Sequence, residues 1–397
     1  MPDASEERAP LPWLRVVVFL ALVSAILFGM HYYLWARLVR DTGMGAPWRE
    51  IFSAGLVLLG VMMVGGFPLM RFAPRWLTSS VMWVAYTWMG LAFLIIVLLG
   101  LGEVVKLSVP LTALAGGMDP GREHLARWIA ASAVSAAAAL TLWGVREARA
   151  GGIGIKRVRI SLPRLPSLRS GYRIAQISDI HVGPTIDRAY LGEIVRRVNA
   201  LEPDLVAVTG DLVDGSVEQL GTHVEPIAEL KARDGTFFVT GNHEYFVRGL
   251  EDWLDFLRKR GVRVLRNERV SIGGSQGFDL AGIDDLTAKS YGRGHGADLR
   301  RALAGRQAER PVVLLAHQPR QVKDAIAHGV DLQLSGHTHG GQIFPFSVLV
   351  RLFEPYLAGC FTLGQTQLYV SRGTGYWGPP MRLGAPAEIT LIELVSE

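Results

Sequence analysis

The chain has 397 residues, of which 49% are hydrophobic and only 19% are charged. Soluble proteins carry about a quarter charged residues, so this composition argues against a single soluble domain and indicates a membrane portion joined to a globular portion. The formal net charge of +5 divides into +3 for residues 1–150, +5 for 151–170 and −3 for 171–397. The basic excess lies beside the membrane portion, so we expect no nucleic-acid partner. The one cysteine, Cys360, excludes an internal disulfide framework and a cysteine-rich metal site.

Residues 1–150 carry four apolar runs that are about as long as a membrane-spanning helix, which needs roughly 20 residues. The first run is too long for the hydrophobic region of a signal peptide and further runs follow it, so we interpret it as an uncleaved anchor. The sequence therefore predicts a membrane domain over residues 1–150, with helices at Leu14–Trp35, Ile51–Met70, Val81–Leu101 and Trp128–Val145.

A fifth apolar segment, Val104–Gly116, contains Lys106 and Pro110 and is too short to span a bilayer. It either prolongs the third helix or lies at the membrane interface. Four spans place both ends of the chain on the same side of the membrane, whereas a fifth span would place them on opposite sides.

The distribution of Lys and Arg between the loops predicts the orientation of these helices, because basic residues concentrate on the cytoplasmic side. With four spans, the side shared by both chain ends carries eleven basic residues and the other side carries six. We therefore expect a multi-pass protein of the cell membrane whose C-terminal half is cytoplasmic. The eleven are Arg8, Arg15, Arg71, Arg75, Arg146, Arg149, Lys156, Arg157, Arg159, Arg164 and Arg169, and the six are Arg37, Arg40, Arg49, Lys106, Arg122 and Arg127.

A change in composition at the glycine-rich stretch Gly151–Gly154 begins a second domain, predicted over residues 151–397. The basic stretch that follows, Lys156–Arg169, is either a solvated linker or a segment attracted to anionic lipid headgroups. The alternation of apolar and other residues over Ile153–Ile160 also allows an outlying strand of the second domain.

Short apolar runs alternate with helical patterns throughout the rest of this domain, which predicts an α/β fold. The expected strands are Arg173–Ser178, Asp204–Thr209, Thr236–Thr240, Val262–Leu265, Phe278–Ile283, Pro311–Ala316, Leu332–Ser335, Gln367–Ser371 and Glu388–Leu394. The expected helices are Asp187–Leu201, Val217–Ala232, Arg248–Arg260, Ala297–Ala304 and Arg320–His328.

Polar motifs stand at the carboxyl ends of five of these strands, where open α/β sheets gather ligands. Each motif alone is weak evidence, since a histidine or a Gly-Asp after a strand is most often structural. Buried carboxylates and imidazoles are costly unless they are paired or bind metal, so their recurrence at one end of five strands favours a metal site. The motifs are Asp179-x-His181, Gly210-Asp211-x-x-Asp214, Gly241-Asn242-His243-Glu244, His317 and Gly336-His337-x-His339.

These motifs resemble those of the calcineurin-like metallophosphoesterases, over a region from about Ile153 to the C-terminus. The resemblance implies a four-layer α/β/β/α sandwich behind the helical transmembrane region. Three further segments, Ile177–Gly183, Gly336–Gln342 and Ser371–Gly375, look like a bacterial branch of membrane-associated phosphodiesterases, some of which cleave a lipid-linked nucleotide diphosphate. The whole chain is similar to the transmembrane proteins with a metallophosphoesterase domain. One departure is His317–Arg320, where that pattern would have Asn-Pro-Asp after the histidine.

The resemblance implies two divalent metal ions that share one bridging carboxylate, Asp211. Ligands of carboxylate, amide and imidazole type without thiolate suit Mn, Fe or Zn. Such a pair of ions can ionise a bridging water and neutralise the phosphoryl oxygens during in-line attack. One ion would be held by Asp179, His181, Asp211 and His339, and the other by Asp211, Asn242, His317 and His337.

The same resemblance assigns the catalytic roles to His243 and Asp214. His243 would protonate or neutralise the leaving oxygen, and Asp214 would orient its imidazole and raise its pKa.

The sequence thus predicts an integral-membrane phosphoesterase with two metal ions, acting on a phosphodiester or pyrophosphate. The alternative is a catalytically silent version of the fold that serves as a membrane-tethered interaction module, although an intact ligand set argues against it. The apolar residues within Gly340–Gly378 either pack on the core of the domain or form a lip for an acyl chain or the bilayer. The lip would suit a lipid-linked or otherwise amphiphilic substrate.

Overall fold

The computed structural model describes residues 13–107, 120–247, 249–292 and 294–396. Its contacts divide the chain into two compact units. The N-terminal unit consists of Glu7–Val145 with Gly378–Met381, and the C-terminal unit contains Arg146–Trp377 and Arg382–Glu397. The domain boundary expected near residue 150 stays a prediction.

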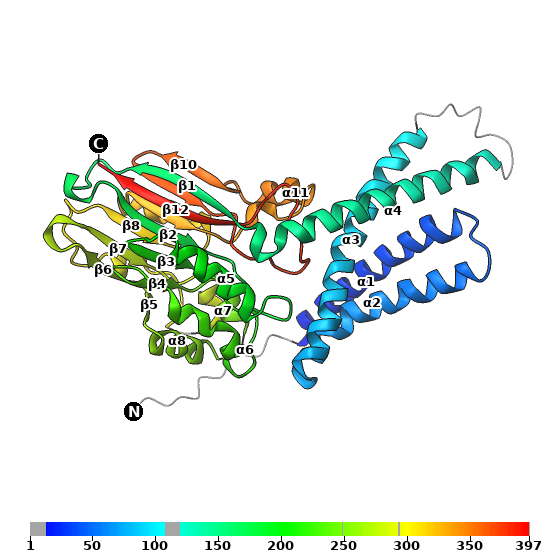
Figure 1. Ribbon diagram of the computed structural model, residues 1–397, viewed down its shortest axis with the longest axis horizontal. Helices are drawn as coiled ribbons and strands as arrows, with labels where there is room; N and C mark the ends of the chain where they lie inside the picture. The colour runs from blue at the N-terminus through cyan, green and yellow to red at the C-terminus, as the bar shows by residue number, and fades with distance from the viewer. Residues whose placement is uncertain (1–12, 108–119, 248, 293, 397) are drawn as a thin grey trace. The chain divides into compact units, whose positions relative to one another are not determined.

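Within the described residues, the N-terminal unit contains four long helices (Figure 1), and all four are long and apolar enough to cross a membrane. Each of the four predicted apolar runs lies within one of them. The fifth apolar segment continues the third helix as far as Leu107, and its remainder lies outside the described residues. The helices are α1 (Trp13–Trp35, continued by a π-helical turn, Ala36–Arg40), α2 (Trp48–Phe72), α3 (Arg75–Leu107) and α4 (Pro120–Ala148).

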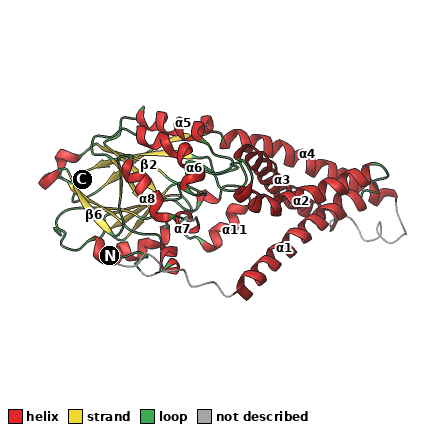
Figure 2. Ribbon diagram, turned by 90° about the horizontal axis from the view of Figure 1, so that it is seen from below, coloured by secondary structure: helices red, strands yellow, loops and turns green. Residues whose placement is uncertain are grey.

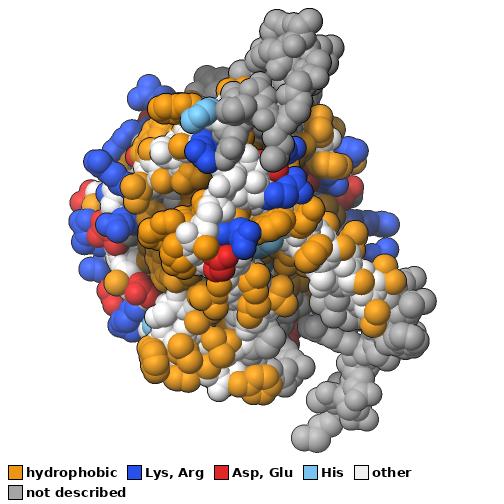
Figure 3. Space-filling view, turned by 90° about the vertical axis from the view of Figure 1, so that its right-hand side faces the viewer, with side chains coloured by type: hydrophobic (Ala, Val, Ile, Leu, Met, Phe, Trp, Pro, Cys, Tyr) orange, Lys and Arg blue, Asp and Glu red, His pale blue; other side chains and the backbone are white. Residues whose placement is uncertain are grey.

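The surface of these helices is apolar, as expected for segments that face lipid. Most of the large hydrophobic side chains that are exposed in the described residues belong to α1–α4, among them Phe28, Val57 and Leu142. Figure 3 shows broad hydrophobic areas on the face that it displays. The histidine of α1, His31, has both ring nitrogens within hydrogen-bonding distance of partners, the carbonyl of Leu27 and the indole N–H of Trp88, which supports a structural role.

The C-terminal unit contains two six-stranded mixed sheets. In the first sheet, β2, β3, β4 and β5 run parallel, and β12 joins β2 in the antiparallel sense while pairing in parallel with β1. Its strand order is β1 (Gly154–Ser161), β12 (Glu388–Val395), β2 (Tyr172–Ile177), β3 (Leu205–Thr209), β4 (Thr236–Val239) and β5 (Val262–Val264).

In the second sheet, β11, β9, β8 and β7 run parallel, and an antiparallel strand lies at each edge. Its order is β10 (Gly359–Leu363), β11 (Thr366–Val370), β9 (Leu332–Ser335), β8 (Val312–Leu315), β7 (Phe278–Gly282) and β6 (Glu268–Ile272).

Three buried hydrophobic clusters separate four layers, which confirms the predicted α/β/β/α sandwich. The central cluster lies between the two sheets, for example between Ile174 of β2 and Leu334 of β9. A second cluster packs helices on the outer face of the first sheet, and a third does so on the second sheet. Figure 2 shows the strands between helices of this unit. The packed helices are α5 (Arg188–Asn199), α6 (Val217–Val224) and α8 (Leu250–Lys259) on one side, and α9 (Leu299–Ala302) and α10 (Val322–Ala327) on the other.

The basic stretch Lys156–Arg169 is not the solvated linker that was one of our two interpretations. Its first part forms most of β1, which confirms the outlying strand. Further on, Arg164 makes a salt bridge of 2.7 Å with Asp331, and Arg169 donates to two backbone carbonyls of the β6–β7 connection. These contacts anchor the segment to the second sheet, so it is part of the folded domain.

Several elements differ from the prediction. The helix expected at Val217–Ala232 ends as an α-helix at Val224, because Pro226 follows and the chain continues as a 3₁₀ turn. Strands β6 and β10 were not expected, nor were the short helices α7 (Asn242–Phe246) and α11 (Phe346–Phe353). The two strands lie at a sheet edge, where few apolar residues are required and the hydrophobic pattern is correspondingly weak.

Candidate metal centre

The loops that carry the predicted ligands meet because of the strand directions. β2, β3 and β4 are parallel neighbours in the first sheet, and β8 and β9 are parallel neighbours in the second. Each of the five strands is followed within a few residues by one of the polar motifs. Parallel strands bring their carboxyl ends to the same edge, and the two stacked sheets bring their two edges together.

Five of the predicted ligands have a left-handed backbone. Their φ angles are 54° at Asp179, 56° at His181, 53° at Asp211, 74° at His337 and 51° at His339. Such angles cost energy for residues other than glycine and concentrate at functional sites. The strained turns point the side chains away from the strand direction and toward a common centre.

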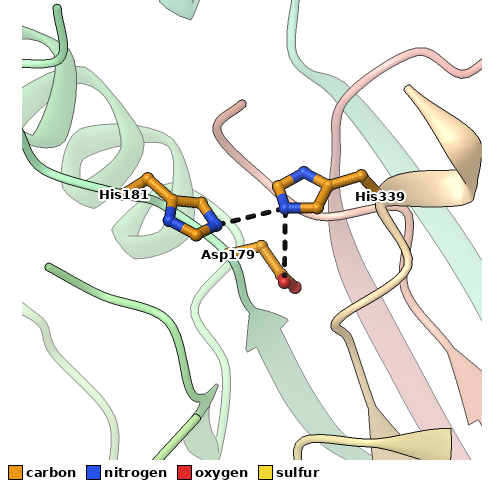
Figure 4. A group of neighbouring side chains, drawn as sticks. All are labelled: Asp179, His181 and His339. Carbon is orange, nitrogen blue, oxygen red and sulfur yellow. Dashed lines mark hydrogen bonds and ion pairs between the residues drawn. The ribbon is translucent and has the colours of Figure 1, made fainter. Parts of the chain in front are cut away.

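The first cluster consists of Asp179, His181 and His339, whose ligand atoms all lie within 4.8 Å of one another. Figure 4 shows the two imidazoles facing each other beside the Asp179 carboxylate. The Nε2 atoms of His181 and His339 are 3.1 Å apart, and Nε2 of His339 is 3.6 Å from Oδ1 of Asp179. A group of this composition could hold a divalent cation.

The second cluster consists of Asp211, His317 and His337. Nε2 of His317 lies 3.2 Å from Oδ2 of Asp211 and 3.3 Å from Nδ1 of His337. The Asn242 amide oxygen completes the group, at 3.0 Å from Nδ1 of His337 and 3.2 Å from Nε2 of His317. The structure therefore brings together all four residues predicted for the second ion.

Asp211 connects the two clusters. Its Oδ2 atom lies 3.7 Å from Nε2 of His181 and 3.2 Å from Nε2 of His317, so one carboxylate oxygen faces an imidazole of each group. A third possible group joins Asp211 and His181 with His243. The family resemblance assigned His243 to protonation of the leaving group rather than to metal binding, and that assignment stays a prediction.

Hydrogen bonds behind two of the histidines orient them for metal binding. Nδ1 of His317 lies 2.8 Å from the backbone carbonyl of Thr209, and Nδ1 of His181 lies 3.0 Å from the Asp214 carboxylate. An acceptor at Nδ1 fixes the proton there and leaves the lone pair of Nε2 for a metal. His339 differs, because the buried Arg382 guanidinium lies 3.2 Å from its Nδ1 and also donates to its backbone carbonyl.

The charges of the site fit a cation. Burial and the nearby Arg382 hold the pKa of His339 well below its usual range, so its imidazole is neutral. Burial favours the neutral form of Asp211, but His317 and His243 outweigh it and keep its pKa well below the usual range. Buried carboxylate and imidazole groups facing one another are the donor set of a hard or borderline metal ion.

His243 and Asp214 lie together beside this centre. Nδ1 of His243 is 2.8 Å from Oδ1 of Asp214, and the same oxygen faces His181. Burial opposes a charge on His243, but Asp211 and Asp214 outweigh it and raise its pKa to about 9. Burial also favours the neutral form of Asp214, and His181 and His243 reverse this and lower its pKa to about 2.

Glu244 has a role that the sequence did not reveal. Its buried carboxylate accepts hydrogen bonds from the backbone N–H groups of Asp211, Leu212 and Gly241, at 2.6–3.0 Å. It therefore holds the loop of Asp211 against the loop of Asn242. One feature of the sequence could have indicated this role. The fourth residue of the Gly-Asn-His-Glu motif is acidic, and no ligand role was assigned to it.

Gln318 occupies the position where the sequence departs from the resembling pattern. It is buried, its side-chain amide donates to Asp285 at 2.9 Å, and its backbone N–H lies 3.2 Å from Gln321. These hydrogen bonds hold Gln318 in place directly after His317, so Gln318 supports the loop that carries this ligand.

Comparisons with known proteins agree with this geometry. The sequence pattern of the family described as calcineurin-like phosphoesterase matches residues 172–341. A protein of zebrafish, Danio rerio, called transmembrane protein with metallophosphoesterase domain, is 34% identical over 95% of this chain and 89% of its own length. A cattle (Bos taurus) protein of the same name is 39% identical over 78% of this chain and 73% of its own length. An uncharacterized metallophosphoesterase of Helicobacter pylori is 41% identical over 62% of this chain and 65% of its own length.

Gly336, which precedes the predicted ligand His337, provides a test of the packing around Asp179. A Cβ atom at Gly336 would overlap Ser178 Oγ and Asp179 Oδ2. Overpacking of this kind costs about 1–3 kcal/mol, so Gly336→Ala should displace Asp179 and lower affinity at the first cluster about tenfold or more. Isothermal titration with Mn²⁺ measures this effect.

Gly192→Ala is the matched control, because a Cβ atom there meets nothing within 4 Å and the residue lies inside α5. It should leave metal affinity unchanged. A Gly336→Ala protein that binds two ions with unchanged affinity would contradict the close packing around Asp179.

Proposed function

The chain belongs to the calcineurin-like phosphoesterase family, and we propose that it is a membrane-anchored hydrolase of phosphodiesters or pyrophosphates that uses two divalent metal ions. The observation that carries this proposal is the continuous cluster of seven predicted ligands, in which Asp211 faces both groups. The residues proposed as ligands are Asp179, His181, Asp211, Asn242, His317, His337 and His339.

When bound, the two ions would supply an activated water as nucleophile and positive charge for the phosphoryl oxygens. The chain supplies the other functions. His243 is held by Asp214 and faces Asp211, so it is placed to give a proton to the leaving oxygen. Glu244 keeps the Asp211 and Asn242 loops at a fixed separation, which pre-organises the centre before substrate arrives.

The four apolar helices and the transmembrane relatives support an integral-membrane location. Both ends of the chain lie on one side if each helix crosses once. We place that side in the cytoplasm because it carries eleven of the seventeen basic residues counted above. The catalytic unit then works at the cytoplasmic surface of the cell membrane.

The helix that follows the ligand turn supports an amphiphilic substrate. α11 begins seven residues after His339, has no buried residues, and exposes Val348, Leu349, Leu352 and Phe353. These side chains do not pack on the core of the domain. Their exposure favours the interpretation of α11 as an apolar lip. Apolar surface of this kind would bind an acyl chain, at roughly 0.8 kcal/mol per buried CH₂.

The position of α11 relative to the ligands is fixed by hydrogen bonds. Thr338, between the two ligand histidines, donates to the backbone carbonyl of Leu357 at 2.6 Å. Glu354, at the end of the helix, makes a salt bridge of 2.9 Å with Arg320. A lipid bound to α11 would therefore have its phosphate held near the metal centre.

The role of Asp211 is tested by Asp211→Asn. Loss of the shared carboxylate should lower bound metal toward one or zero ions per chain and abolish hydrolysis of bis-p-nitrophenyl phosphate. Metal analysis of the purified protein and a Mn²⁺-dependence assay measure both effects. Asp255→Asn, at an exposed carboxylate paired with Arg258, is the control and should change neither. Two ions with near-normal turnover in Asp211→Asn would refute the assignment.

His243→Ala separates proton transfer from metal binding. We expect metal content to survive while kcat falls by about 10²–10⁴, and the loss should be largest for alkyl leaving groups, which need a proton most. A series of phosphodiesters with different leaving-group pKa values measures this dependence. His328→Ala, at an exposed histidine of another loop, is the control. An equal loss for all leaving groups, together with loss of metal, would show that His243 is a ligand.

The topology is tested with paired reporter fusions. A fusion at the C-terminus should be active only with a cytoplasmic reporter, and a fusion after Met44, between α1 and α2, only with an external reporter. The reverse pattern would overturn the proposed orientation.

The lipid-linked substrate is tested by Phe353→Asp, which places a charge on the apolar face of α11. It should raise KM for an acylated substrate and leave cleavage of bis-p-nitrophenyl phosphate unchanged. Leu168→Asp is the matched control, since Leu168 is similarly exposed and precedes β2 at the end opposite the ligands. Equal efficiency of the unaltered protein on acylated and water-soluble forms of one headgroup would show that the membrane helices only set the location.

A further inference from the structure

A buried carboxylate outside the predicted ligand set lies at the same edge of the second sheet as His317. Asp285 is completely excluded from water. It stands three residues after the end of β7, and His317 stands two residues after the end of β8. The two strands are parallel neighbours in which Gly282 pairs with Leu315. Asp285 and His317 therefore occupy adjacent loops, and the proposed function gives Asp285 no role.

The two carboxyl oxygens of Asp285 differ in their surroundings. Oδ1 accepts hydrogen bonds from the Thr287 backbone N–H at 2.8 Å, from the Thr287 hydroxyl at 2.6 Å and from the Gln318 side-chain amide at 2.9 Å. Oδ2 is buried and has no hydrogen-bond partner among the residues that the structure describes.

The neighbouring Asp284 shows the contrast. It is also buried, but both of its oxygens accept from the Arg266 guanidinium, at 2.8 Å each. A buried carboxyl oxygen without a partner is costly. We therefore expect a positive group close to Asp285 in the complete protein.

The nearest predicted cation is the second metal ion, and two observations connect Asp285 to it. Gln318, which donates to Asp285, directly follows the predicted ligand His317. The charge of Asp285 also reaches this ligand. Burial opposes a charge on His317, but Asp211, Asp179 and Asp285 outweigh it and keep its pKa well above the usual range.

We propose that Asp285 is the charge partner of the second metal ion, a positioning residue that does not bind the ion but raises its affinity. It would act by its negative charge and through Gln318, which holds it against the loop of His317. Groups behind metal ligands commonly strengthen binding in this way. The connection uses the position where the sequence departs from the resembling pattern, and the inference rests on the second ion of the proposed function.

The test is Asp285→Asn, which removes the charge and keeps an Oδ1 atom for the three hydrogen bonds. The full-length, metal-free protein in detergent is titrated with Mn²⁺ by calorimetry. One of the two binding steps should weaken by about 10- to 100-fold, while the other stays unchanged. His317→Ala should abolish the same step and so identifies it as that of the second cluster. Asp285→Ser, which is smaller and also uncharged, should weaken this step as well.

The melting temperature of the metal-free protein separates a role in metal binding from a role in the fold. Because the hydrogen bonds of Oδ1 remain, Asp285→Asn should leave this temperature unchanged. Asp204→Asn is the control, since Asp204 is a partly buried carboxylate that accepts a backbone N–H just before β3, at the end opposite the ligands. It should leave both binding steps unchanged.

The possible failures can be told apart. If Asp285→Asn leaves both steps unchanged, or weakens both equally, Asp285 is not the partner of the second ion, and the two-ion centre itself stands. A single binding step in the unaltered protein would contradict the proposed function together with this inference. Two ions with the expected dependence on Asp285, in a protein that hydrolyses no ester, would contradict the proposed function and leave the role of Asp285 standing.

Discussion

The constraint on which the rest of this structure depends is the burial of carboxylates and imidazoles where two sheets meet. Asp179, Asp211 and His317 are almost completely excluded from water. Groups of this kind are stable there only when opposite charge or hydrogen-bond donors surround them. The chain satisfies part of this need, because the backbone N–H of His337 donates to Asp179, His317 faces Asp211, and the Thr209 carbonyl faces His317. Cations at the two clusters would satisfy the remainder.

The polar site is supported by a framework of apolar strands. The strands under the site are almost entirely buried, and their hydrophobic residues hold the sheets face to face. The reactive residues are confined to the loops after the strands, where left-handed turns aim them inward. The apolar helix α11 is anchored to the same loops by the hydrogen bond from Thr338 to the carbonyl of Leu357.

Much of this arrangement could be predicted from the sequence, because strand periodicity and the polar motifs after each strand are local signals. The four apolar helices, most strands and the clustering of the ligands follow from them. Glu244 was missed as a structural residue because it acts through backbone N–H groups, so the motif shows that an acidic residue is present but not what it binds. α11 was missed because it lies in a glycine-rich stretch, and the proximity of Trp377 to His243 depends on contacts between residues far apart in the chain.

We propose that Asp211 is shared by two metal ions in one centre. The most direct measurement is the electron paramagnetic resonance spectrum of the full-length protein loaded with Mn²⁺, together with the metal content per chain. A shared carboxylate predicts two ions per chain and a spectrum of an exchange-coupled pair. One ion per chain, or two ions with the six-line signal of isolated Mn²⁺, would contradict the account.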